Sequence, residues 1–177
     1  MEGDRRRGED QGRRPAQLTD PRMPSKPRRT TGLRRVRGPW RVAVVEGSML
    51  PAIEPGDWLL VDPTTIRWPR RGSVVVFHEP DGGALAVKRV AAGPGDRVPF
   101  AQGYLELADD EAWLVSDATA EDAAEQGFGA PTDSRVYGPV PVELLVGRAW
   151  FRYAPLRRIG LIAKHPGRPV PGPSSVS

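Results

Sequence analysis

Short apolar runs, broken at close intervals by glycine and proline, constrain the fold of this chain more than any other feature. Of its 177 residues, 20 are Gly and 20 are Pro. Because both residues interrupt helices and favour turns, long helices have little room. Seven runs rich in Val, Leu, Trp and Phe have the length and spacing of antiparallel strands: 41–45, 58–61, 73–77, 84–90, 104–107, 112–115 and 145–153. We therefore predict a mostly β fold built on an antiparallel sheet.

One turn in this pattern predicts which strands are neighbours. Asp81-Gly82-Gly83 stands between the runs 73–77 and 84–90, and such Asp-Gly and Gly-Gly pairs are typical of tight β-hairpins. The run 84–90 should therefore lie beside 73–77. The stretch 118–130 lacks this pattern, and we expect one helical turn or a loop there.

Charge and composition divide the chain into three parts. Residues 1–41 hold 13 Lys/Arg against 5 Asp/Glu, whereas the remaining residues hold 13 against 17. Residues 1–38 are rich in Arg, Gly and Pro, which predicts a disordered basic arm. We expect a folded domain over 39–163 and a Pro-rich flexible tail over 164–177. Met23 is a second candidate for the true start, beside Met1.

The composition also bounds the environment and the partners. No apolar run approaches the ~20 residues that span a bilayer, so we predict no transmembrane segment. The sequence leaves open whether the protein is peripheral at a membrane or cytoplasmic. It also leaves open whether the basic arm is solvated or contacts anionic lipid. The arm has no aromatic residue before Trp40, so nucleic-acid binding is not expected. The absence of cysteine excludes thiolate metal sites and a cysteine nucleophile.

A serine and a lysine are the candidate reactive groups. Ser48 lies in a tight Gly47-Ser48-Met49-Leu50-Pro51 turn, and Lys88 lies inside an apolar strand pattern. With period-two alternation, one of Lys88 and Arg89 faces inward. A buried lysine, unlike an arginine, can lose its proton and act as a base. Together, a serine and a neutral lysine can form a proteolytic dyad. The alternative is that Ser48 is an ordinary turn residue and Lys88 a surface residue, neither with a catalytic role.

Four segments, in order, resemble the type I signal peptidase family, the Ser/Lys endopeptidases that remove leader peptides. They resemble its Ser-Met-x-Pro, Gly-Asp-x-x-x-Val, Lys-Arg-Val with Gly-x-Pro-Gly-Asp, and Asp-Ser-Arg-x-x-Gly-x-Val-Pro blocks. In this chain the four segments are residues 47–51, 56–61, 87–98 and 133–141. The resemblance implies a signal-peptidase-like antiparallel β domain, no metal or cofactor, and a polypeptide substrate with a leader or signal peptide.

The resemblance also implies roles for single residues. Ser48 would attack the scissile carbonyl, Lys88 would take its proton, and the Ser48 backbone N–H would donate to the oxyanion. Met49, Asp133 and Arg135 would support the site, the last two as an ion pair. Substrates would bind extended along a sheet edge, with small side chains one and three residues before the cut.

The chain departs from the family at four places. Ser116-Asp117-Ala118 stands where the family usually has Gly-Asp-Asn, and a longer, acidic connection follows it. Glu46 stands where many members have a serine that completes the oxyanion hole, and Pro131 stands near where they have a serine beside the lysine. The membrane anchor usual in the family is not seen. In this last respect the chain resembles the maturation proteases of nickel-type superoxide dismutase, and we keep such maturation as an alternative function.

Two further alternatives follow from the same residues. An inactive relative that binds peptides would account for Glu46 and Pro131. Self-cleaving repressors use a related serine and lysine, but residues 1–38 show no helix-turn-helix pattern and no Ala-Gly cleavage site precedes Ser48. Loss of cleavage on replacement of Ser48 would separate an enzyme from a binding module.

Overall fold

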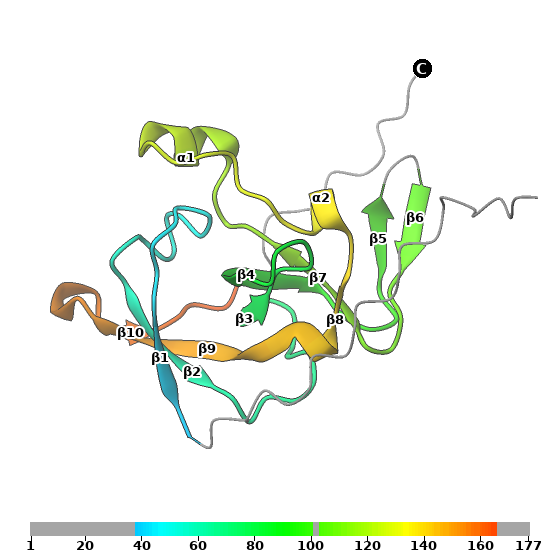
Figure 1. Ribbon diagram of the computed structural model, residues 1–177, viewed down its shortest axis with the longest axis horizontal. Coiled ribbons are helices and arrows are strands. Elements are labelled where there is room, and N and C mark those ends of the chain that lie inside the picture. The colour runs from blue at the N-terminus through cyan, green and yellow to red at the C-terminus, as the bar shows by residue number, and fades with distance from the viewer. Residues whose placement is uncertain (1–37, 101–102, 166–177) are drawn as a thin grey trace, which may run out of the picture. The chain divides into compact units, whose positions relative to one another are not determined.

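A curled antiparallel sheet forms the body of the protein, as Figure 1 shows. The computed structural model describes residues 38–100 and 103–165, so the predictions for residues 1–37 and 166–177 lie outside the described residues. Ten strands are assigned: β1 Trp40–Ala43, β2 Trp58–Asp62, β3 Val74–His78, β4 Leu85–Ala92, β5 Arg97–Phe100, β6 Gly103–Glu106, β7 Glu111–Val115, β8 Val140–Pro141, β9 Leu145–Ala154 and β10 Gly160–Leu161. The prediction of a mostly antiparallel β fold is confirmed.

The strand order brings distant parts of the sequence together. The main sheet runs β1-β2-β9-β3-β4-β7-β8, with β10 beside β9, while β5 and β6 form a separate hairpin. β9 therefore lies between β2 and β3 and joins the first hairpin to the rest of the sheet. The predicted hairpin across Asp81-Gly82-Gly83 is confirmed, because β3 pairs antiparallel with β4 and Val75 stands opposite Lys88.

The sequence did not predict three of the strands. β5 contains Pro99, and a proline within a run argues against a strand unless the strand lies at an edge. β8 and β10 are only two residues long. The sequence cannot separate such short pieces from turns, because only their pairing with β7 and β9 defines them.

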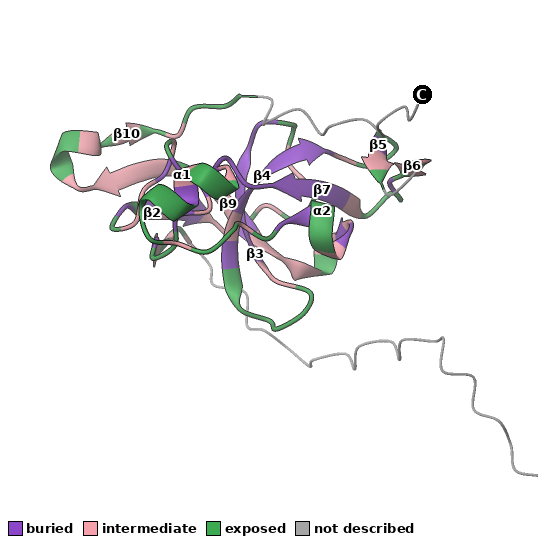
Figure 2. Cartoon of the chain, turned by 90° about the horizontal axis from the view of Figure 1, so that it is seen from above, coloured by how far each residue is buried: buried purple, intermediate pink, exposed green. Residues whose placement is uncertain are grey.

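The core divides into three apolar clusters along the sheet. One lies under β1, β2 and β9 and includes Met49 and Ile53, a second lies around β3, β4, β7 and β8, and a third packs the β5–β6 hairpin against Trp113. The strands β3, β4 and β7 run through the buried centre (Figure 2). β4 is thus covered on both faces, which matters for its charged residues.

The expectation that only one of Lys88 and Arg89 faces inward is wrong. Lys88 is 2 % exposed and Arg89 is 0 % exposed. The two side chains do point to opposite faces, as a strand requires, but each face is covered by another part of the chain. Burial on both sides is a property of the sheet's surroundings, which alternation alone cannot reveal.

Helices are few and short in the described part of the chain. α1 spans Ala120–Glu125 and α2 spans Ser134–Tyr137, with two 3-10 turns, η1 at Val142–Leu144 and η2 at Leu156–Arg158. α1 falls within the stretch 118–130, where a helical turn or a loop is expected. Thr119 and Asp122 form a capping box that starts α1. None of the helices in the described segments has the length and apolar character needed to cross a membrane.

The crossing of β9 and β2 depends on a residue without a side chain. A Cβ atom on Gly147 would lie 2.5 Å from the Asp62 carbonyl oxygen and 2.8 Å from a Val61 methyl carbon. We expect Gly147→Ala to lower the free energy of unfolding by about 1–3 kcal/mol, because backbone has to move to admit the methyl group. Denaturant unfolding of both proteins measures the change. Gly82→Ala is the control, since nothing lies within 4 Å of its Cβ position; an equal loss in both variants would contradict the argument.

Candidate active site

Ser48 is carried by a loop whose apolar side chains anchor it in the core. The loop connects β1 to β2 and is closed at its base, where the Val44 N–H donates to the Asp57 carbonyl at 2.9 Å. Met49, Leu50 and Ile53 are at most 2 % exposed. These buried side chains fix the turn next to them, which leaves Ser48 half-buried at the surface of the loop. Met49, predicted as a supporting residue, lies in the core cluster beneath the turn.

The Lys88 ammonium and the Ser48 hydroxyl are in hydrogen-bond contact. Nζ of Lys88 lies 2.8 Å from Oγ of Ser48, although 40 residues separate them in sequence. Lys88 lies in the middle of β4, which pairs with β3, and its side chain reaches the loop that carries Ser48. The sheet therefore brings together the two reactive groups that the sequence singles out.

The surroundings of Lys88 favour its neutral form. Loss of water on burial lowers the pKa of Lys88 below the ordinary 10.5, and this effect exceeds the opposing attraction of four carboxylates. Those carboxylates belong to Glu79, Asp133, Glu46 and Asp117. A lysine with a lowered pKa next to a serine hydroxyl can accept the proton of that hydroxyl.

A segment that the sequence did not assign to the site covers the nucleophile turn. The Ala118 N–H donates to the Ser48 carbonyl at 3.2 Å. A Cβ atom on Gly47 would lie 2.6 Å from the ring of Phe128, so a larger residue at this position would displace the ring. Residues 118–130 thus pack directly on the Ser48 turn. The only signal in the sequence was the length of this connection, which exceeds that expected from the family resemblance.

The two supporting residues on α2 form the predicted ion pair. Nη2 of Arg135 lies 2.5 Å from Oδ2 of Asp133, and Asp133 also accepts from the Ser116 N–H at 2.9 Å. Burial favours the neutral acid, but the hydrogen bonds from Arg135 and Ser116 outweigh it and lower the pKa of Asp133. Asp133 therefore stays ionised and ties the start of α2 to the end of β7.

Arg89 makes a second buried ion pair on the opposite face of β4. Its Nε and Nη2 donate to the two carboxylate oxygens of Asp117 at 2.8 and 2.6 Å, and its Nη1 donates to the carbonyls of Gly72 and Ala163. Such a two-point pair fixes both position and direction. It holds Asp117, and with it Ala118, against β4. The sequence carried a signal for it, since Ser116-Asp117-Ala118 stands where the family has Gly-Asp-Asn.

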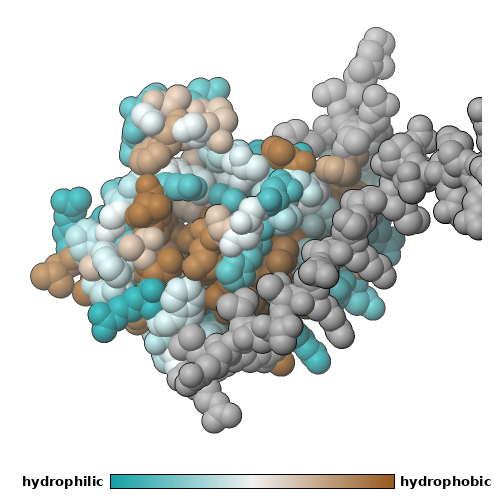
Figure 3. Space-filling view, in the orientation of Figure 1, coloured by the Kyte–Doolittle hydropathy of each residue, from teal (hydrophilic) through white to brown (hydrophobic). Residues whose placement is uncertain are grey.

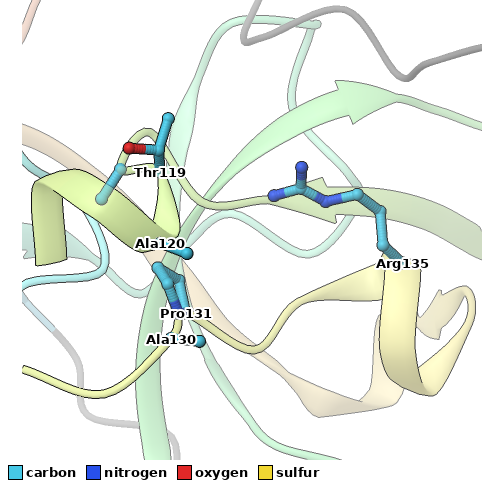
Figure 4. Close-up of a pocket in the computed structure, with 6 residues that line it drawn as sticks. Thr119, Ala120, Ala130, Pro131 and Arg135 are labelled. Atoms are coloured by element: carbon cyan, nitrogen blue, oxygen red, sulfur yellow. The ribbon is translucent and has the colours of Figure 1, made fainter. Parts of the chain in front are cut away.

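Glu46 and Pro131, two of the departures from the family pattern, occupy different places. Glu46 is exposed next to the nucleophile turn, and its charge acts on Lys88. Pro131 lies with Thr119, Ala120 and Ala130 around a small cavity that Arg135 also lines (Figure 4). Within the described segments, no three His, Asp or Glu side chains gather in a way that would hold a metal ion.

Comparison with known proteins identifies the family. The model of the family described as "Signal peptidase, peptidase S26" matches residues 39–129, about half of the chain. Signal peptidase I of Leptolyngbya laminosa is 29 % identical over 143 residues, which cover 67 % of this chain and 70 % of that protein. Mitochondrial inner membrane protease subunit 1 of Xenopus tropicalis is 31 % identical over 128 residues, which cover 67 % and 71 %. Probable signal peptidase I-1 of Synechocystis is 27 % identical over 146 residues, which cover 64 % and 70 %.

The family match and these relatives identify the chain as a peptidase. The chain belongs to the peptidase S26 family of signal peptidases, which confirms the predicted family and a protease function of the signal peptidase I type. The likeness to the maturation proteases of nickel-type superoxide dismutase stays a prediction.

Burial of Lys88 has a consequence for stability that depends on pH. Because the folded-state pKa is lowered, the unfolded chain binds more protons between that pKa and about 10.5, and stability rises with pH across this window. We expect Lys88→Met to be more stable than the wild type at neutral pH, with a gain that shrinks as the pH approaches 10.5. Urea unfolding at several pH values measures the difference. Exposed Lys164, changed to Met, is the control and should alter little; a gain that grows with pH would contradict the lowered pKa.

Proposed function

We propose that the protein is a serine endopeptidase that removes leader or signal peptides with a Ser48–Lys88 dyad. The observation that carries the proposal is the 2.8 Å contact between Nζ of Lys88 and Oγ of Ser48, made by a lysine that is 2 % exposed. Neutral Lys88 takes the proton of Ser48 as its oxygen attacks the scissile carbonyl, and later delivers a proton to the leaving amine.

The oxyanion is proposed to be held by the backbone of the nucleophile turn. Ser48 donates no backbone hydrogen bond to another described residue, so its N–H is available to the developing negative charge. The loop is fixed by buried Met49 and by the bond from Ala118 to the Ser48 carbonyl. A donor that is already held in place needs no reorganisation when charge develops.

A free strand edge beside Lys88 supports extended substrate binding. β7 pairs with β4 from Arg89 to Ala92, so that among the described residues Leu85–Lys88 has β3 on one side and no strand on the other. An extended peptide can add itself to such an edge through main-chain hydrogen bonds. Apolar side chains also gather in a hollow at the centre of the face below α1 (Figure 3). A surface of this kind suits the small apolar side chains expected before the cut.

The dyad makes a direct prediction for activity. We expect Ser48→Ala and Lys88→Met each to lower kcat/KM by roughly 10³-fold or more, because each removes a group that takes part in bond making or proton transfer. The assay is cleavage, in detergent, of a peptide with small residues one and three positions before the cut. Lys164→Met, which changes an exposed lysine, should cleave like the wild type.

Other outcomes separate the alternative functions. Cleavage of a superoxide dismutase precursor but not of the general peptide would favour the maturation protease. A folded wild type that binds both substrates and cuts neither would favour the inactive binding module. Full activity in folded Lys88→Met would exclude Lys88 as the base.

Glu46 should influence the pH profile through its charge alone. Its carboxylate raises the pKa of Lys88, and the acid side of the kcat/KM profile reports the pKa of the base in the free enzyme. We expect Glu46→Gln to move that side of the profile to lower pH, by a small amount because Glu46 is exposed and water screens it. Glu106→Gln, an exposed change in β6, is the control. A shift of the profile to higher pH would show that Glu46 acts in another way.

A further inference from the structure

A small cavity opens beside the nucleophile turn, between the two ends of the segment that covers it. It measures about 230 Å³ and is lined by Ala118, Thr119, Ala120, Ala130, Pro131 and Arg135. Pockets for free small molecules usually measure ~300–1,000 Å³. The cavity therefore suits one side chain of a larger ligand and not a whole small molecule.

The residues around this cavity leave room for a small, uncharged side chain. Five of the six residues are Ala, Pro or Thr, and only Arg135 carries charge. Figure 4 shows Arg135 reaching from α2 toward the space from the side opposite to Thr119 and Ala120. Nε and Nη2 of Arg135 donate to Asp133, whereas Nη1 donates to no other described residue. That group can donate to a peptide carbonyl, while a cationic side chain would be repelled at the same place.

One residue of the cavity wall is hydrogen-bonded to Ser48, the proposed nucleophile. Ala118 lines the cavity, and its N–H donates to the Ser48 carbonyl at 3.2 Å. The buried pair of Arg89 with Asp117 holds the preceding residue against β4. The core thus holds Ala118, one part of the cavity wall, in place relative to Ser48.

The free edge of β4 ends at the point where the segment that lines the cavity leaves β7. A peptide along the free edge of β4 can follow Leu85–Lys88 but not beyond, because Val115 of β7 pairs with Arg89. From there the chain of the protein passes through Ser116 and Asp117 to Ala118. A peptide that ran in this direction past Lys88 would leave the sheet where residues 116–118 follow β7.

We propose that the cavity is the subsite for a residue on the leaving side of the cut. This proposal rests on the proposed function, in which the residues before the cut occupy the β4 edge. One of the first two residues after the scissile bond places an apolar side chain, of the size of Ala to Leu, among Ala120, Ala130 and Pro131. Nη1 of Arg135 then lies near the peptide carbonyls at the mouth. The segment 118–131 thereby selects the new N-terminus of the product.

Cleavage of matched peptides tests the subsite. All peptides keep Ala one and three positions before the cut, and only the two following residues vary among Gly, Val and Lys. We expect kcat/KM to be about 10-fold higher for Val than for Gly at one of these positions, and lower for Lys than for Gly. Ala120→Leu and Ala130→Leu fill the cavity from exposed positions and should reduce the Val preference to about twofold or less. Ala124→Leu, exposed on α1 but outside the cavity, should keep it.

A binding measurement separates this proposal from the dyad. The same peptides are titrated into Ser48→Ala, alone and combined with Ala130→Leu or Ala124→Leu. We expect Val peptides to bind more tightly than Gly peptides to Ser48→Ala and to its combination with Ala124→Leu, but not to its combination with Ala130→Leu. This result supports the subsite even if the wild type cuts none of the peptides, an outcome that would contradict the proposed dyad. Equal binding and equal cleavage of Val and Gly peptides, or a preference that both leucine variants retain, would overturn it.

Discussion

Burial of one amine beside one hydroxyl is the interaction on which the rest of this structure depends. A lysine removed from water is costly unless its charge is paired or lost. In this protein the four nearby carboxylates reduce that cost only in part, so the pKa of Lys88 is lowered. The same burial favours the neutral, basic form of the lysine next to Ser48. The sheet around β4 supplies the apolar contacts that make such a site stable.

The two faces of β4 carry charged residues with different contacts. On one face Lys88 contacts Ser48. On the other face Arg89 donates hydrogen bonds to Asp117 and to the carbonyls of Gly72 and Ala163. Neighbouring residues of a strand point to opposite faces, so the lysine next to Ser48 and the ion-paired arginine cannot exchange places. Arginine is suited to the structural role because it keeps its charge and bonds a carboxylate at two points.

The segment between β7 and α2 gives the site features of its own. Within it, Phe128 lies on Gly47 and the Ala118 N–H donates to the Ser48 carbonyl, while the two ends of the segment line a small open cavity. Pro131, which stands where the family resemblance leads us to expect a serine, lines that cavity. This relation links the departure from the family to the proposed leaving-side subsite.

The sequence by itself determined the antiparallel β character, the hairpin across Asp81-Gly82-Gly83 and the two residues that meet at the site. These features are local, because turn residues and apolar alternation act over a few positions, and the four blocks lie in short segments. Only the tertiary structure decided that both Lys88 and Arg89 are buried, that Phe128 covers Gly47, and that Ala118 holds Ser48. Each of these depends on contacts between residues tens of positions apart, whose geometry is set by the order of strands in the sheet and not by any one segment.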